Sequence, residues 1–274
     1  MSGLSDDQPG SAGPQQIAAI IPAHNESGRI GATVRAALAI RAVTMVLVVD
    51  DGSTDATSQR AREAGAVVVR HSRNQGKAAA METGAAVVAM RDEPATPPRG
   101  LLFIDADLED SAAKTAALIE PVVAGQADFT VAVLPRPAGA GGWGLALGLA
   151  RRGIKAATGY TARAPLSGQR CLSREAFNRA TPLARGWGVE AAMTVDLLRQ
   201  GFTIQEIDCD LRHRTSGKSV RGTLHRAAQF RDVALALAAR RVKRTGGQAR
   251  TRIKQTLSGP RPPRRPKATD ESGA

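Results

Sequence analysis

Residues 45–55 read MVLVVDDGSTD, an apolar run that ends abruptly in two acids and a glycine. Residues 45–50 are mostly β-branched or otherwise apolar, which predicts a buried strand. Residues 54–64 have helical spacing, and Asp51 or Ser53 could cap that helix. A strand, a short polar loop and a helix in this order predict a β–α unit of an α/β fold.

The same unit repeats along the first half of the chain. Strands are predicted at residues 17–22, 45–50, 66–70, 101–104 and 129–134, and helices at 30–40, 54–64, 77–90 and 111–123. The predicted strands are apolar on both faces, which is typical of a mostly parallel sheet covered by helices on both sides. Ligands of such sheets bind at the carboxyl ends of the strands.

Composition limits the class of protein. Apolar residues make up 42% of the 274 residues but aromatic residues only 3%, so the core must be built from Ala, Val, Leu and Ile. The two cysteines cannot form a cysteine zinc cluster, and they fit a reduced, cytoplasmic protein, with one disulfide as the alternative. No apolar stretch approaches the length of a membrane span. Residues 1–15 do not resemble a signal peptide, and we expect a disordered leader there.

The net charge of +13 is concentrated near one end of the chain. Residues 240–267 contain eleven Lys or Arg and no acid. Residues 246–274 are rich in Pro, Gly and basic residues, and we predict a disordered basic tail. This tail has no aromatic residue on which a base could stack, so nucleic-acid binding is the least favoured function.

Polar residues follow four of the predicted strands. These stretches are PAHNE at 22–26, DDGSTD at 50–55, NQGK at 74–77 and DAD at 105–107. In an extended segment Asp105 and Asp107 point to the same side and can share a ligand. Adjacent carboxylates repel each other, and Mg²⁺ or Mn²⁺ relieves this repulsion while also binding phosphate oxygens. We interpret the pair as a clamp for a metal and a diphosphate. The alternative is that Asp107 only caps the next helix and Asp105 is merely exposed.

The segments PAHNE, VVDDGSTD, NQGKAAA and FIDAD, in this order, resemble the nucleotide-sugar half of family 2-type glycosyltransferases with the GT-A fold. The resemblance implies a Rossmann-like sheet at residues 16–135. It extends more weakly through a smaller acceptor-binding half at 136–219, where LSGQRCLSREAF and GWGVEAAMTVDLLRQGF occur. These segments resemble glucosyl-3-phosphoglycerate synthases and also polyprenyl-phosphate sugar transferases related to dolichyl-phosphate mannose synthase.

The resemblance implies a nucleoside pocket near the first two strands. Pro22, Ala23 and Glu26 would line this pocket. Asp50 would accept a hydrogen bond from the base, expected to be uracil, and Ser53 would lie beside it. For Ser53 the structural alternative is the helix cap described above.

The resemblance also implies a site for the diphosphate. Gly76 would let the backbone approach the diphosphate, and Lys77 would add positive charge. The alternative for Lys77 is a solvated lysine in a first helical turn. Asp105 would contact the ribose or the metal, and Asp107 would bind Mg²⁺ or Mn²⁺ directly.

For the acceptor half, the resemblance implies a loop with Gly168 and Arg170 and an acid, Glu190, that faces the acceptor or the sugar. Glu190 could take a proton from the acceptor, or it could simply be a favourable charge in a first helical turn. His213 would be a further metal ligand. Arg212 and Arg214 would hold an anionic acceptor, with a surface basic cluster as the alternative.

The expected function is therefore metal-dependent transfer of a sugar from a nucleoside diphosphate to a phosphorylated acceptor. UDP-glucose is the expected donor and 3-phosphoglycerate the favoured acceptor, with Glu190, Asp107 and Lys77 as the catalytic residues. The alternative is a polyprenyl-phosphate glycosyltransferase peripheral to the inner face of a membrane. In that case residues 220–245, an amphipathic helix, would lie on an anionic bilayer instead of packing on their own domain.

Overall fold

The computed structural model describes residues 16–135, 144–211 and 230–240. The chain divides at residue 240 into two compact units, and all described residues belong to the first. Both predicted halves contribute strands to one sheet in this unit. The predicted leader at 1–15 and tail at 246–274 lie outside the described residues.

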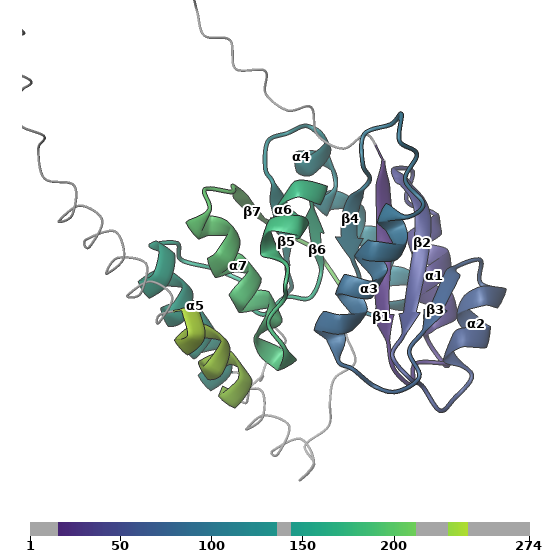
Figure 1. Cartoon of the computed structure of the whole chain (residues 1–274), viewed down its shortest axis with the longest axis horizontal. Coiled ribbons are helices and arrows are strands. Elements are labelled where there is room, and N and C mark those ends of the chain that lie inside the picture. Colours follow the sequence, from purple (N-terminus) through teal and green to yellow (C-terminus); the bar gives the residue numbers. More distant parts are fainter. Residues whose placement is uncertain (1–15, 136–143, 212–229, 241–274) are drawn as a thin grey trace, which may run out of the picture. The chain divides into compact units, whose positions relative to one another are not determined.

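The described residues form a seven-stranded sheet in the order β3-β2-β1-β4-β6-β5-β7 (Figure 1). The strands are β1 (Ile17–Ala23), β2 (Val43–Asp50), β3 (Val67–Arg70), β4 (Gly100–Phe103), β5 (Phe129–Val133), β6 (Arg170–Leu172) and β7 (Ile204–Asp208). Within this sheet β6 runs antiparallel to its neighbours β4 and β5, and the other paired strands are parallel. The carboxyl ends of the parallel strands therefore meet at one edge.

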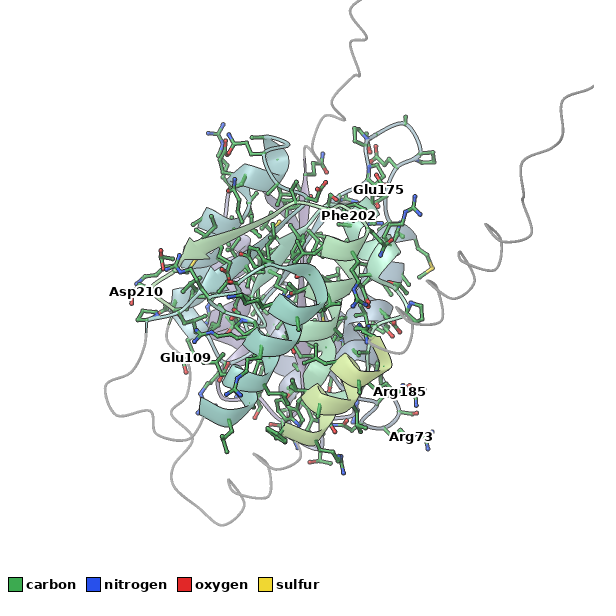
Figure 2. All side chains as sticks on the ribbon, turned by 90° about the vertical axis from the view of Figure 1, so that its left-hand side faces the viewer. Arg73, Glu109, Glu175, Arg185, Phe202 and Asp210 are labelled. Atoms are coloured by element: carbon green, nitrogen blue, oxygen red, sulfur yellow. The ribbon has the colours of Figure 1, made fainter. Side chains whose placement is uncertain are left out.

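The helices cover both faces of the sheet. They are α1 (Ile30–Leu38), α2 (Thr57–Glu63), α3 (Lys77–Ala89), α4 (Glu120–Val123), α5 (Gly144–Thr158), α6 (Arg174–Ala180) and α7 (Val189–Arg199), with 3₁₀ segments η1 (Glu109–Leu118) and η2 (Gly186–Gly188). Successive residues of β2 alternate between two cores: Val46 and Val48 pack with α1 and η1, whereas Leu47 and Val49 pack with α3. This alternation explains why the strand is apolar throughout. Charged side chains such as Arg73, Glu175 and Arg185 lie on the outside (Figure 2).

Two helix predictions need correction. The helix predicted at 111–123 is a 3₁₀ segment followed by α4, which has Pro121 in its first turn. Proline has no backbone N–H to continue a preceding helix, so the chain starts a new one there. The helix predicted at 54–64 begins at Thr57, and neither Asp51 nor Ser53 caps it. The N-cap residue is Ala56, and the Oδ1 of Asp55 just before it accepts the backbone N–H of Thr57 at 3.0 Å.

A third core lies between α5, α7 and a helix formed by residues 230–240. Val233 and Leu237 of this helix are buried against Ile154 and Val195. The guanidinium of Arg240 also pairs with Asp196 on α7. The described part of the predicted amphipathic helix at 220–245 therefore packs on its own domain. None of the described helices is long and apolar enough to cross a bilayer, and Cys171 and Cys209 are buried free thiols.

Candidate active site

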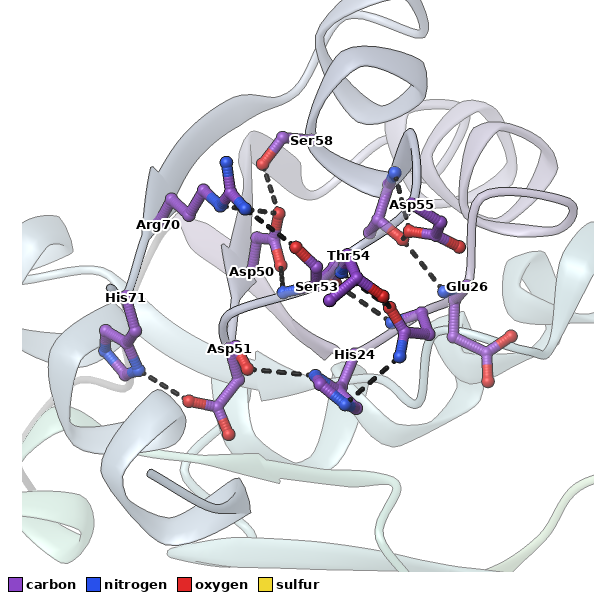
Figure 3. Close-up of polar contacts among 12 residues, drawn as sticks. His24, Glu26, Asp50, Asp51, Ser53, Thr54, Asp55, Ser58, Arg70 and His71 are labelled. Carbon is purple, nitrogen blue, oxygen red and sulfur yellow. Dashed lines mark hydrogen bonds and ion pairs between the residues drawn. The ribbon is translucent and has the colours of Figure 1, made fainter. Parts of the chain in front are cut away.

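Asp50 ends β2 and is buried at the predicted base pocket (Figure 3). Its Oδ1 accepts the backbone N–H of Ser53 at 2.8 Å, and its Oδ2 accepts the hydroxyl of Ser58. The guanidinium of Arg70 lies 3.7 Å from Oδ2. Burial alone raises the pKa of Asp50, but these hydrogen bonds and the charge of Arg70 outweigh it and leave the pKa below its usual value. A base at this pocket would therefore share Asp50 with partners inside the protein.

The loop after β1 lies against the loop after β2. The hydroxyl of Ser53 accepts the backbone N–H of Asn25 at 2.9 Å, and the amide oxygen of Asn25 accepts the N–H of Thr54 at 2.8 Å. Glu26 donates its backbone N–H to Thr57 at 2.8 Å, while its carboxylate pairs with Arg29. These bonds bring the predicted nucleoside-binding residues to one place. Pro22 and Glu26 are half-buried there and Ala23 is buried.

Gly76 and Lys77 form the start of α3. Gly76 has φ +91°, a conformation that favours glycine, and a Cβ at this position would meet no atom within 4 Å. The side chain of Lys77 extends from the first helical position to the centre of the sheet edge. Its Nζ lies 2.7 Å from Oδ1 of Asp105 and 3.1 Å from Oε1 of Glu190. The alternative of a solvated lysine is therefore wrong.

Lys77, Asp105 and Glu190 form the charged centre of the site. Asp105 follows β4, and Glu190 lies in the first turn of α7 with 8% of its surface exposed. Burial alone lowers the pKa of Lys77, but the two nearby carboxylates outweigh it and raise the pKa above its usual value. Lys77 therefore carries a positive charge between one acid of the nucleotide-sugar half and one of the acceptor half.

The predicted acceptor loop closes over this centre. A Cβ on Gly168 would lie 2.7 Å from Oδ2 of Asp105 and would also clash with Nζ of Lys77, so a larger residue would require these side chains to move. Gln169, which the sequence analysis did not select, is buried and donates from Nε2 to Oδ2 of Asp105 at 2.5 Å. Its position directly after Gly168 was a signal that could have identified it.

Arg170 differs from its predicted role of contacting the acceptor. It lies on β6 with 1% of its surface exposed. Its guanidinium donates to the carbonyl of Ser167 at 2.8 Å and to the hydroxyl of Thr194 at 2.9 Å. Burial lowers the pKa of Arg170 to about 10, although the charges of Glu190 and Glu206 act in the other direction. In this geometry Arg170 holds the acceptor loop against α7.

The two predicted metal ligands, Asp105 and Asp107, both lie half-buried in the loop after β4. Among the described residues, no group of three or more His, Cys, Asp and Glu side chains is arranged to hold a metal. The predicted third ligand, His213, lies outside the described residues, as do Arg212 and Arg214. Two carboxylates nevertheless fit Mg²⁺ or Mn²⁺, because such ions commonly take one or two carboxylates and complete their shell with phosphate and water oxygens.

These groups gather at the carboxyl edge of the sheet, where α/β folds bind their ligands. The sequence profile of glycosyl transferase family 2 matches residues 18–178, which is more than half of the chain. The chain therefore belongs to glycosyl transferase family 2. The roles of its individual site residues remain predictions.

Two curated proteins share part of the sequence. Glycosyltransferase AglJ of Haloferax volcanii is 29% identical over 197 residues, which is 69% of this chain and 60% of that protein. An uncharacterized protein of Methanocaldococcus jannaschii is 32% identical over 108 residues, which is 39% of this chain and 42% of that protein. The chain thus spans about half the length of the curated relatives that it matches.

Solved structures with the same fold include glucosyl-3-phosphoglycerate synthase from Mycobacterium tuberculosis. Its complex with Mn²⁺, UDP and glucosyl-3-phosphoglycerate has 25% identity and a TM-score of 0.67, over 82% of this chain and 80% of that chain. Its complex with Mg²⁺ and UDP also has 25% identity and a TM-score of 0.67, over 82% of this chain and 79% of that chain. A complex with Mn²⁺, UDP-glucose and phosphoglyceric acid has 25% identity and a TM-score of 0.66, over 82% of this chain and 79% of that chain. The expected GT-A fold class is confirmed.

Proposed function

We propose that this protein transfers a hexosyl group, with glucose the expected sugar, from a UDP-sugar to a phosphorylated acceptor such as 3-phosphoglycerate. The observation that carries the proposal is the ion-pair centre, in which Lys77 contacts Asp105 at 2.7 Å and Glu190 at 3.1 Å. This centre joins the predicted donor and acceptor halves. Support also comes from the synthase of the same fold, which was crystallised with UDP, a divalent metal and phosphoglycerate compounds.

The donor half would bind the nucleotide through Pro22, Ala23, Glu26, Asp50 and Ser53. Gly76 would lie near the diphosphate, where its backbone conformation leaves open space beside it. Asp105 and Asp107 would hold Mg²⁺ or Mn²⁺, and a cation bound there would supply positive charge to the departing diphosphate. Lys77 would add its own charge to the same group.

Glu190 would face the acceptor. It is a buried carboxylate beside an ammonium group, in the first turn of a helix that begins under the acceptor loop. In an inverting reaction Glu190 would take the proton of an acceptor hydroxyl as that oxygen attacks the sugar. A retaining reaction needs no base on the opposite face, and Glu190 would then orient Lys77.

The acceptor would bind beside Gly168, where the loop backbone comes closest to Lys77 and Asp105. Gln169 would orient Asp105, and the buried guanidinium of Arg170 would keep the loop in place. Arg212 and Arg214 would contact the acceptor phosphate, and His213 would complete the metal site; these three residues are proposed on the sequence resemblance alone.

A screen of nucleotide sugars tests this proposal. Purified protein with Mn²⁺ is incubated with each donor, with and without 3-phosphoglycerate, and release of nucleoside diphosphate is measured. We expect 3-phosphoglycerate to accelerate loss of UDP-glucose without lipid or detergent. If no donor is consumed with any phosphorylated acceptor, the proposal is wrong.

A second candidate acceptor, a polyprenyl phosphate at a membrane surface, is favoured by one observation. The helix at 230–240 leaves Leu235 62% exposed and Phe230 42% exposed, although its other face is buried. Apolar side chains of this kind beside basic residues suit an anionic bilayer. Flotation with anionic liposomes tests the idea, because each basic residue near the surface contributes about 1 kcal/mol and makes binding sensitive to salt. Liposome binding with transfer only to a lipid phosphate would replace the first proposal.

A further inference from the structure

Asp51 receives three hydrogen bonds in a buried position, and none of the roles above explains them. It follows Asp50 at the end of β2, and 4% of its surface is exposed. Its Oδ1 accepts the backbone N–H of Gln75 at 2.8 Å, and its Oδ2 accepts that of Gly76 at 2.7 Å. The third partner is Nδ1 of His71, 2.7 Å from Oδ1. A buried carboxylate needs several such donors to offset its lost hydration.

His71 connects this carboxylate to helix α3. It lies at the end of β3 with 8% of its surface exposed, and its ring points toward Asp51 (Figure 3). Its other ring nitrogen, Nε2, lies 3.0 Å from the hydroxyl of Thr83 on α3. Because an ionised carboxylate only accepts hydrogen bonds, Nδ1 carries a proton, and in the neutral ring Nε2 accepts one from Thr83.

These contacts fix both ends of the loop that leads into α3. His71 anchors the start of the loop, and Asp51 holds its end at Gln75 and Gly76. The middle lies directly on Gly52, where a Cβ would come within 2.5 Å of the carbonyl carbon of Arg73. The next residue after this loop is Lys77, whose ammonium reaches Asp105 and Glu190. A shift of the loop therefore moves Lys77 relative to both carboxylates.

We propose that His71 is a positioning residue for the donor side of the active site. It orients the Asp51 carboxylate so that each oxygen faces one loop amide, and it thereby sets the position of Lys77. This inference rests on the proposed function for its effect on turnover, but its effect on the loop is independent of any activity.

The test compares four variants of the full chain. His71→Ala removes both ring bonds, whereas His71→Asn keeps an N–H close to the position of Nδ1 and loses only the contact with Thr83. Thr83→Val removes that contact alone. The control, Thr130→Val, removes a buried threonine hydroxyl that donates to the carbonyl of Leu118 on another part of the sheet. All four are measured for melting temperature, for amide exchange at Gln75 and Gly76 by NMR, and for steady-state kinetics.

For His71→Ala we expect faster exchange of the Gln75 and Gly76 amides, and a KM for the nucleotide sugar raised about 10-fold, the low end for losing a group that orients a site residue. The KM for the acceptor should stay unchanged. His71→Asn should bring both the amide exchange and the KM for the nucleotide sugar most of the way back to wild-type values. Thr83→Val should change these two properties in the same direction as His71→Ala, but less. Thr130→Val should lower the melting temperature but change neither the exchange of the Gln75 and Gly76 amides nor the KM for the nucleotide sugar.

Two results would overturn the inference. One is a His71→Ala variant that loses stability while its two loop amides and its donor KM remain at wild-type values. The other is a His71→Asn variant as impaired as His71→Ala, because the bond to Asp51 would then not carry the effect. If the wild-type protein transfers no sugar, the proposed function fails, and the exchange rates still decide whether His71 fixes the loop.

Discussion

At the scale of single residues, the site is organised around one cation between two acids. Lys77 begins a helix, where positive charge is unfavourable for the helix dipole. Its ammonium is held there by Asp105 and Glu190, which lie at the ends of two other elements. The unfavourable interaction of Lys77 with the helix dipole is thus offset by its ion pairs with Asp105 and Glu190, which lie at the proposed active site.

Replacing Lys77 by Met tests this cation directly. The side chain keeps its approximate length but loses its charge, so kcat should fall about 10²–10³-fold, as when one preorganised donor to a developing negative charge is removed. Steady-state kinetics with the best donor would measure the change. The matched control is Lys155→Met on the exposed face of α5, which should retain wild-type turnover. A fully active Lys77→Met variant would exclude Lys77 from charge stabilisation.

The proposed metal ligand gives a second prediction at this scale. Asp107→Asn removes the charge of a half-buried carboxylate without changing its size, so metal-dependent turnover should be abolished while the fold remains intact. Activity is measured across a Mn²⁺ titration, and the fold by circular dichroism. Asp110→Asn, an exposed acid in the next segment, serves as the control. Turnover that EDTA does not diminish in the wild-type protein would contradict the metal clamp.

At the scale of elements, loops with special backbone requirements hold the functional groups. The acceptor loop approaches Asp105 so closely that Gly168→Ala should displace either the loop or the ion pair. A displacement of about 1 Å can cost about 100-fold in rate, so kcat/KM should fall by up to that factor. Gly148→Ala in α5, where a Cβ would meet only ordinary contacts, is the control. A fully active Gly168→Ala variant would contradict this prediction, because the Lys77–Asp105 pair would then accommodate the methyl group without loss.

The hydrogen bonds that Asp55 accepts at the start of α2 allow a prediction about pH. Burial raises the pKa of Asp55, but the hydrogen bonds from Thr57 and Ser27 together outweigh it and lower the pKa to about 2 from its ordinary value of 3.8. Because the folded protein favours the charged form, the stabilisation is complete above the ordinary value and is lost as the pH falls toward 2. Asp55→Ala removes the acceptor of the Ser27 and Thr57 N–H groups and should reduce the free energy of unfolding by about 1 kcal/mol at pH 7.

The difference in the free energy of unfolding between wild type and Asp55→Ala should shrink when denaturant unfolding is repeated at about pH 2.5. At that pH the carboxylate is mostly protonated in the unfolded state and partly protonated in the folded state. A difference that stays constant between the two pH values would mean that the charge of Asp55 is not what stabilises the start of α2.

At the scale of the whole molecule, every described site residue lies within the first compact unit, between Pro22 and Glu190. The basic tail at 246–274 contains charge but no predicted catalytic group. Deleting it should therefore leave turnover of a soluble acceptor nearly unchanged, as measured in the same donor assay. A large loss of activity with the soluble acceptor would place part of the tail in the active site.

The sequence by itself determined the α/β class, the order of strands and helices in the first half, and the edge at which the site lies. These features follow from local patterns: apolar runs define buried strands, and polar residues directly after them must meet at one edge of a parallel sheet. The segments around Asp50, Gly76 and Asp105 were recognisable for the same reason, since each is a short contiguous motif. Ends of helices were less accurate, because they depend on single residues: Asp55 accepts the N–H of Thr57 at the start of α2, and Pro121 lacks the N–H that would continue the preceding helix.

Only the tertiary structure decided which of these groups touch. It paired Lys77 with Glu190, buried Arg170 inside the acceptor half, and joined Asp51 to His71. No local pattern contains these contacts. The first two depend on the insertion of antiparallel β6 between β4 and β5 and on the packing of α7 beneath the acceptor loop, and the third depends on the parallel pairing of β2 with β3. A motif fixes which chemical groups stand at the end of a strand, whereas the distance between two such groups is set by how distant segments pack.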